Sequence, residues 1–186
     1  MHRARLSQRL SWCAAVCLVV VCAAWGAIAQ SHPSEYDVKA AYLYNFAKFV
    51  KWPSDSKAAR NSSFTICVLG NDPFGGALET TVSGEKIDGK PAAVKRIAGV
   101  RDASTCNILY IAPSERWRVG EILSTLNRDS TLTVSDIPEF TDRGGMIGFV
   151  LDSGRVRFKI NLSAAQEARL NLSSELLKVA ANVKKH

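Results

Sequence analysis

The positions of the histidines restrict the catalytic chemistry open to this chain. Its three histidines are His2, His32 and His186, which all stand near one of the two ends. No internal histidine is available as a general base for a serine or cysteine nucleophile, or as a zinc ligand in a packed site. The sequence also lacks the G-x-S-x-G, P-loop and G-x-G-x-x-G motifs. These observations argue against serine or cysteine hydrolases, zinc enzymes, P-loop nucleotide hydrolysis and dinucleotide-dependent chemistry.

Carboxylates are the remaining candidates for acid–base chemistry. Five aspartates stand near the ends of expected strands: Asp72, Asp102, Asp136, Asp142 and Asp152. Aspartate is favoured at such places because its side chain bonds the local backbone as a cap or turn residue. We therefore expect these residues to be structural. The prediction is a protein that is not an enzyme, with no catalytic residue, no metal site and no cofactor.

Residues 1–29 have the pattern of a cleaved secretory signal. Three arginines lie among the first nine residues, Leu10–Ala27 carries no charge, and Ala27 and Ala29 place small residues at the −3 and −1 positions. We expect cleavage after Ala29 and a mature chain of residues 30–186. The formal net charge then falls from +7 to +4 because the three arginines are removed. The mature chain is expected outside the cytoplasm, without membrane insertion.

Two alternatives to cleavage concern the same segment. The apolar run is about eighteen residues long, just enough to span a bilayer as an uncleaved anchor. A lipoprotein is disfavoured, because Cys17 and Cys22 each follow valine where a small residue is expected.

The cysteines of the mature chain are Cys67 and Cys106, since the other three of the five lie in the signal segment. Their spacing provides neither a C-x-x-C redox motif nor a cysteine zinc knuckle. In an exported chain, two cysteines most simply form a disulfide. It would close a loop of about forty residues and contribute roughly 3–4 kcal/mol. Two buried free thiols are the alternative.

The periodicity of apolar residues predicts helices that alternate with strands. Glu35–Val50 carries two apolar arcs on a helical wheel, and Trp52-Pro53 ends this helix. Asp152-Ser153-Gly154 is a turn signal between two β-rich arms. The expected strands are Phe64–Leu69, Lys86–Ile97 (a strand or hairpin), Asn107–Ile111, Thr131–Ser135, Met146–Leu151 and Val156–Ile160, and the later helices are a short stretch to Val82, Ser114 to about Asn127, Ser163–Leu170 and Ser173–Val183.

This order of elements predicts the fold class. Strand–helix alternation in the first half favours a partly parallel sheet, and large sheets often carry an antiparallel extension. We expect a single α/β domain with a mixed, mostly parallel sheet flanked by helices and a C-terminal antiparallel hairpin.

A polar turn, Gly70–Gly75, follows the first expected core strand. In α/β folds, ligands bind where such a turn leads into a helix, and free N–H groups there can hold an anion. Asn71 and Phe74 are therefore candidate ligand or partner residues. A tight strand-to-helix connection is the plainer interpretation.

Asn45 and Trp52 are further candidates. Asn45 interrupts an apolar stripe of the first helix and could contact a ligand, although a buried asparagine bonded to the backbone is more usual. Trp52 closes a run of aromatic residues that are core residues by default. An exposed subset of that run would mark a protein interface.

Three basic residues, Arg155, Arg157 and Lys159, alternate with apolar residues on the last arm of the hairpin. They form one positive strand face, which either protects an edge by charge or binds an anion or acidic partner. The other Lys and Arg residues are spread along the chain without the aromatic interleaving that tracks nucleic acid. We therefore expect no nucleic-acid partner.

Four segments resemble the YfiR-like proteins. The first is Tyr36-Asp-Val-Lys-Ala-Ala-Tyr-Leu-Tyr-Asn-Phe-Ala-Lys-Phe-Val-Lys-Trp-Pro53, and the second is Ile66-Cys-Val-Leu-Gly-Asn-Asp-Pro-Phe-Gly75. Arg143-Gly-Gly-Met-Ile-Gly-Phe-Val150 with Val156-Arg-Phe-Lys-Ile-Asn161 is the third, and Asn171-Leu-Ser-Ser-Glu-Leu-Leu-Lys-Val-Ala180 is the fourth. The resemblance covers essentially the whole mature chain in order.

The resemblance implies a non-enzymatic periplasmic signalling adaptor. It would bind the sensory region of a membrane-bound diguanylate cyclase of the YfiN type and inhibit it, which lowers cyclic di-GMP and biofilm formation. A YfiB-type outer-membrane lipoprotein is a further implied partner, and a homodimer is implied as well. The alternative is a periplasmic module that binds a small nucleotide or aromatic ligand for another membrane sensor.

The resemblance also bears on the cysteines. Cys67 and Cys106 match a cysteine pair of the characterised member of that family. A second pair near its late hairpin has no counterpart here, because Gly148–Arg155 contains no cysteine. A redox switch on that hairpin is therefore not expected in this chain.

Overall fold

The computed structural model describes residues 33–126 and 129–185. Residues 1–29, for which a cleaved signal is expected, the three histidines and Asn127 lie outside these residues, so the predictions made for them stay predictions. The strands are β1 (Val50–Lys51), β2 (Phe64–Leu69), β3 (Lys86–Ile87), β4 (Lys90–Ile97), β5 (Ile108–Ile111), β6 (Leu132–Ser135), β7 (Ile147–Asp152), β8 (Arg155–Asn161), β9 (Asn171–Leu172) and β10 (Asn182–Lys184). The α-helices are α2 (Glu35–Phe49), α3 (Ala77–Val82), α4 (Val119–Leu126), α5 (Leu162–Glu167) and α6 (Ser174–Val179), and the 3₁₀ helices are η1 (Ala58–Arg60), η2 (Val100–Thr105) and η3 (Pro113–Glu115).

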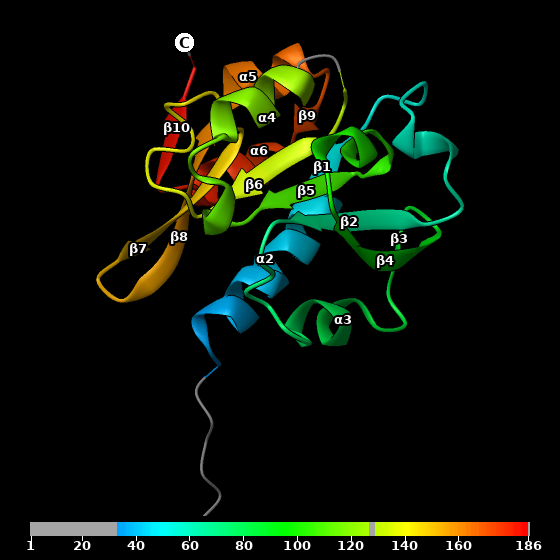
Figure 1. Ribbon diagram of the computed structural model, residues 1–186, viewed down its shortest axis with the longest axis horizontal. Coiled ribbons are helices and arrows are strands. Elements are labelled where there is room, and N and C mark those ends of the chain that lie inside the picture. The colour runs from blue at the N-terminus through cyan, green and yellow to red at the C-terminus, as the bar shows by residue number, and fades with distance from the viewer. Residues whose placement is uncertain (1–32, 127–128, 186) are drawn as a thin grey trace, which may run out of the picture. The chain divides into compact units, whose positions relative to one another are not determined.

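Eight strands form the central sheet, in the order β10-β8-β7-β6-β5-β2-β4-β3. Strands β4, β2, β5, β6 and β7 run parallel to their neighbours. The β7–β8 pair is an antiparallel hairpin, and β3 pairs with β4 in the same antiparallel way. Helices lie on both faces of the sheet (Figure 1). The predicted fold class is confirmed.

Strand β2 is buried on both faces, which explains its unbroken run of apolar residues. Ile66 and Val68 belong to the core cluster under α2 and α3, together with Phe46 of α2. Cys67 and Leu69 point the other way, into the cluster that contains α4 and η2. Each large apolar side chain buried in this way contributes roughly 1.5–3 kcal/mol.

Helix α2 begins where its sequence provides a capping box. The Ser34 hydroxyl accepts a hydrogen bond from the Asp37 N–H at 3.2 Å, and the Ser34 N–H donates to the Asp37 carboxylate at 2.8 Å. The helix ends at Phe49 and leads into β1, where Val50 pairs with Leu172 of β9. The predicted helix is confirmed to within one residue.

Two expected helices begin at other residues than the sequence predicts. The helix expected from Ser114 begins at Val119, because Pro113–Glu115 forms a 3₁₀ turn and the Ser114 hydroxyl accepts from the Asn71 N–H instead of capping. Helix α5 begins at Leu162, capped by Asn161, whose side chain accepts from the Ala164 N–H at 3.1 Å.

The helix expected over Ser173–Val183 is too long, because its last residues form a strand. Helix α6 ends at Val179, and Asn182–Lys184 becomes β10, parallel to β8. The edge of β8 offers unpaired backbone groups, and pairing with them is favoured over a last helical turn.

A disulfide joins Cys67 of β2 to Cys106, which lies between η2 and β5. The two Cα atoms are 5.9 Å apart, and both side chains are fully buried. The expected disulfide is therefore present, and the alternative of two free thiols is wrong for this structure. The bond ties two neighbouring strands on the α4 side of the sheet.

Removing this disulfide will destabilise the fold. We expect the double variant Cys67→Ala/Cys106→Ala to lower the free energy of unfolding by about 3–4 kcal/mol, because the unfolded chain loses a loop constraint. Urea denaturation of the oxidised mature chain and of the variant measures the difference. A change below about 1 kcal/mol would show that the bond does not constrain the unfolded chain.

Candidate functional site

A partly buried carboxylate with three partners lies where β6 ends, its side chain 11% exposed. Asp136 accepts hydrogen bonds from the Tyr36 hydroxyl at 3.0 Å, from the Lys39 ammonium at 2.5 Å and from the Tyr110 hydroxyl at 2.5 Å. Lys39 also contacts Glu35, one helical turn earlier, at 2.5 Å. We call Tyr36, Lys39, Tyr110 and Asp136 the Asp136 cluster.

Three elements position this cluster. Tyr36 and Lys39 are three residues apart on α2 and so share one face of the helix. Tyr110 belongs to β5 and Asp136 follows β6, and parallel neighbouring strands end at the same edge of a sheet. Ser135 fixes the exit of the chain, because its hydroxyl donates to the Ile111 carbonyl at 2.7 Å and accepts from the Ile137 N–H at 3.0 Å.

The protonation states in the cluster follow from burial and from the carboxylate. Burial raises the pKa of the Tyr110 phenol, and the charge of Asp136 raises it further. The pKa of Tyr36 is raised by the same two causes in the same order. Burial alone would lower the pKa of Lys39, but its hydrogen bonds to Asp136 and Glu35 outweigh this and raise it. Lys39 therefore stays charged, and both tyrosines stay neutral donors.

These states limit what the cluster can do chemically. A charged ammonium is not a nucleophile, and a neutral tyrosine of raised pKa is not a base. The side chain of Lys39 is only 3% exposed. A buried ion pair contributes little net stability over apolar side chains, but removing one partner is costly. The cluster thus orients α2 against the sheet and holds a fixed charge pattern.

A cleft of about 390 Å³ opens beside the cluster. Its lining combines apolar side chains with three carboxylates and one ammonium. The residues are Glu35, Lys39, Asp136, Pro138, Glu139, Phe149, Val150 and Leu151. Such a surface suits binding of a cationic group that carries apolar atoms.

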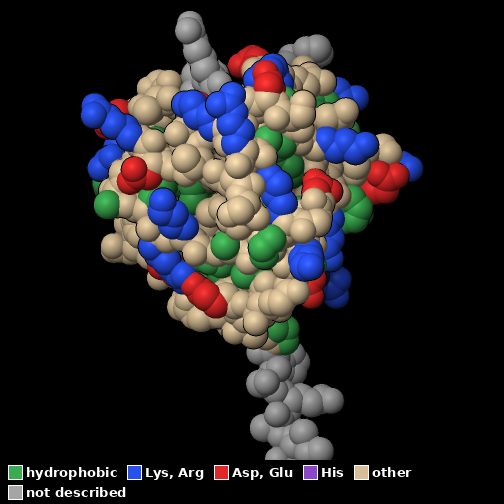
Figure 2. Space-filling view, turned by 90° about the vertical axis from the view of Figure 1, so that its right-hand side faces the viewer, with side chains coloured by type: hydrophobic (Ala, Val, Ile, Leu, Met, Phe, Trp, Pro, Cys, Tyr) green, Lys and Arg blue, Asp and Glu red, His purple; other side chains and the backbone are tan. Residues whose placement is uncertain are grey.

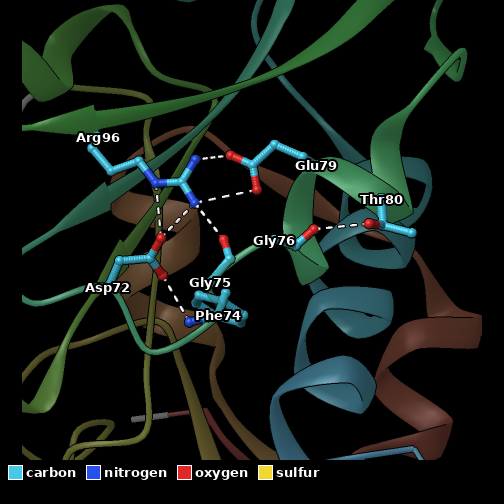
Figure 3. A network of polar contacts seen from close by, with 7 residues as sticks. All are labelled: Asp72, Phe74, Gly75, Gly76, Glu79, Thr80 and Arg96. Carbon is cyan, nitrogen blue, oxygen red and sulfur yellow. Dashed lines mark hydrogen bonds and ion pairs between the residues drawn. The ribbon is translucent and has the colours of Figure 1, made fainter.

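The Gly70–Gly75 turn is braced by polar contacts within the chain (Figure 3). Asp72 accepts from the Phe74 N–H at 2.8 Å, as expected of a turn residue. The Arg96 guanidinium bonds Asp72 and the Gly75 carbonyl, and it also pairs with Glu79 of α3. This network links the turn, β4 and α3.

The crevice beside this turn is filled by the chain itself. Gly70 has φ +92°, and a Cβ there would lie 2.5 Å from Ser114 Oγ and 2.8 Å from Glu115 Cγ. The Asn71 N–H is already engaged by Ser114, and Phe74 is buried against Tyr36 and Tyr110. Asn71 itself is exposed, whereas Phe74 supports the Asp136 cluster from inside.

Asn45 and Trp52 both lie apart from the Gly70–Gly75 turn. Asn45 is exposed and lines a separate groove of about 290 Å³ between α2 and α6, so the expected burial of this residue is wrong. Trp52 donates from its indole N–H to the Asn107 carbonyl at 3.1 Å and packs edge-on against Phe64. It therefore lies at the N-terminal ends of β2 and β5, away from the Asp136 cluster.

The basic face of β8 has the predicted alternation. Arg155, Arg157 and Lys159 are exposed, while Phe158 and Ile160 are buried. Figure 2 shows another side of the molecule, the one with β3 and β4, and there Lys and Arg side chains are scattered among acidic and neutral ones. The role of the three basic residues in binding stays a prediction.

Sequence reasoning missed most of the Asp136 cluster. We expected Asp136 to bond its local backbone, but its side chain binds residues 26 to 100 positions away. The Glu35–Lys39 spacing of four residues was the one local signal, because it allows an ion pair on a helix. The tyrosines resembled ordinary core aromatics.

The described residues contain no group of three or more His, Cys, Asp or Glu that could hold a metal ion. None of the helices in residues 33–126 and 129–185 is long and apolar enough to cross a membrane.

Fold and site together define a small disulfide-bonded α/β protein. Sequence comparison matches residues 36–181 to the YfiR/HmsC-like family, and the chain belongs to that family. Membership suggests a periplasmic regulator in the diguanylate cyclase pathway, from a regulatory and non-catalytic family. No curated protein sequence matches the chain significantly.

Two solved structures resemble this fold. A conserved domain protein from Vibrio cholerae O1 biovar eltor is 12% identical with a TM-score of 0.56, over 81% of this chain and 60% of that chain. The ABC domain from Streptococcus pneumoniae, solved in complex with L-Trp, is 13% identical with a TM-score of 0.48. The match covers 64% of this chain and 55% of that chain. The chain thus spans less than two thirds of either structure. At 12% identity, the first likeness shows the fold alone.

Because Tyr110 donates to Asp136, substitution of Tyr110 should lower the stability of the fold. We expect Tyr110→Phe to lower the free energy of unfolding by about 1.5–3 kcal/mol, because a buried charge loses a hydrogen-bond donor. Urea denaturation measures this change.

Tyr44→Phe is the matched control, because it removes a hydroxyl that contacts Glu85 at the surface. Its expected effect is below about 0.5 kcal/mol. Equal effects of the two variants would contradict the assigned role of the cluster.

Proposed function

We propose that this chain is a non-enzymatic periplasmic signalling adaptor that binds and inhibits a membrane-bound YfiN-type diguanylate cyclase. Inhibition lowers cyclic di-GMP and so restrains biofilm formation. The observation that carries the proposal is the family match over residues 36–181, which covers nearly all of the described chain. Its partner is the sensory region of the cyclase, and a YfiB-type outer-membrane lipoprotein is a second partner.

The site geometry supports binding over catalysis. Lys39 and both cluster tyrosines donate to Asp136, so the polar groups of the cluster are engaged within the chain. Large apolar side chains stand exposed on the surface, as a protein interface requires. They are Phe49, Trp117, Leu151 and Val179.

The proposal places the mature chain in the periplasm after removal of residues 1–29. There it acts as a homodimer, without nucleic acid and without insertion into the membrane. The disulfide supports this location, because such bonds persist in oxidising compartments.

Deleting the gene will raise cyclic di-GMP and increase biofilm, because the cyclase loses its inhibitor. Mass spectrometry of nucleotide extracts and a biofilm stain measure both. The full chain should restore the wild-type level, and a chain without residues 1–29 should not, because it stays in the cytoplasm. Unchanged cyclic di-GMP in the deletion strain would refute the cyclase link, and rescue by the leaderless chain would refute the periplasmic site of action.

A second candidate function rests on the groove between α2 and α6. Its floor is formed by Phe46 and Phe158, while Asn45 and Glu175 provide polar groups among the apolar lining. An apolar cavity with a few polar groups is the usual form of a small-molecule site. We propose a small aromatic ligand here as the alternative, for a module that serves another membrane sensor.

Thermal unfolding with nucleotides and aromatic amino acids tests this alternative. A ligand at one hundred times its Kd would stabilise the fold by about 2.7 kcal/mol and raise the Tm. Asn45→Ala should reduce that shift, whereas Asn71→Ala, outside the groove, should not. No shift with any compound of the panel would count against the alternative.

A further inference from the structure

Strand β7 extends beyond the strand beside it. The β6–β7 register ends at the pair Ser135–Gly148, whereas β7 continues to Asp152 and pairs there only with β8. The two arms of the hairpin project from the body of the domain (Figure 1). Within the described residues, no strand pairs with Phe149–Asp152 on the β6 side.

The backbone groups of Leu151 point to this free edge. In the neighbouring strand, the Phe158 carbonyl accepts from the Ala181 N–H, so Phe158 directs its backbone groups away from β7. Residues directly opposite in an antiparallel pair share this orientation, and it repeats every second residue. Phe149 lies opposite Phe158, and Leu151 opposite Val156. The N–H and carbonyl of Leu151 therefore face the open side.

The two edges of the hairpin differ in how well they are protected against pairing with a further strand. Along β8, Arg155, Arg157 and Lys159 provide the charges that discourage strand addition, and β10 covers its base. The segment Phe149–Leu151 carries no charge, and the Leu151 side chain is 60% exposed. An apolar, unguarded edge is suited to pairing with another extended chain.

The cleft beside this edge adds charge selectivity. Phe149, Val150 and Leu151 form one wall of it, and Glu35, Asp136 and Glu139 outnumber Lys39 among its charged lining. This local excess of negative charge contrasts with the mature chain as a whole, whose expected formal net charge is +4. A basic side chain is therefore the favoured occupant.

We infer that the free edge of β7 binds an extended segment of a protein partner as an additional strand. Backbone hydrogen bonds to Leu151 hold the segment, and a Lys or Arg side chain of the partner enters the acid-lined cleft. The inference rests on the proposed function, since it assigns the surface through which a protein partner binds.

The test compares two proline variants at directly opposite positions of the hairpin. Leu151→Pro removes the N–H that faces the free edge, and Val156→Pro makes the same change on the guarded edge. Isothermal titration measures the affinity of each mature chain for the purified sensory region of a YfiN-type diguanylate cyclase from the same bacterium. We expect about tenfold weaker binding for Leu151→Pro and wild-type affinity for Val156→Pro.

A charge variant keeps the test valid if proline lowers stability. Glu139→Lys reverses one charge of the cleft without touching the strand, and we expect about two- to fivefold weaker binding. Wild-type affinity in both Leu151→Pro and Glu139→Lys would overturn the inference. The inference would also be overturned if Leu151→Pro changed only the self-association of the chain, measured by sedimentation, because the strand bound at the edge would then come from a second copy of this chain.

A synthetic probe separates this inference from the cyclase link. A peptide in which valine alternates with arginine should bind the wild-type chain more tightly than one in which valine alternates with glutamate, and Leu151→Pro should bind neither. If the peptides behave so while the cyclase region does not bind, the proposed function fails and the edge site stands. Equal binding of the two peptides would overturn the edge site itself.

Discussion

The Asp136 carboxylate is the constraint on which the site depends. It lies where the chain leaves β6, and two residues of α2 and one of β5 donate to it. A largely desolvated carboxylate that lost these donors would be unfavourable, so the three hydrogen bonds favour the observed position of the helix against the sheet. Phe74 packs against both tyrosines and brings the Gly70–Gly75 turn into the same arrangement.

The same carboxylate lines the cleft beside the free edge. Strand β6 ends at Ser135, next to Asp136, and does not pair with β7 past Gly148. The hairpin continues alone to Asp152, and the space left beside it is the acid-lined cleft. A site with fixed charges thus adjoins a strand that has one unpaired edge. This combination suits a regulator that recognises a partner by its backbone and one basic side chain.

Local patterns predicted the fold, because its elements are encoded by neighbouring residues. The apolar run Phe64–Leu69 and the turn signal at Ser153-Gly154 each determine structure within a few positions. The Asp136 cluster joins residues up to 100 positions apart, so no local pattern reveals it. Strand β10 was missed for the same reason, since Asn182–Lys184 becomes extended only by pairing with β8.

Hydrogen exchange at the backbone of β7 tests the central claim most directly. Exchange of the mature chain is followed amide by amide, with and without the purified sensory region of the cyclase. The account predicts that exchange at Leu151 slows at least tenfold in the complex, while amides of the buried strand β2 are unchanged. A complex that protects other surfaces and leaves Leu151 exchanging at its free rate would contradict it.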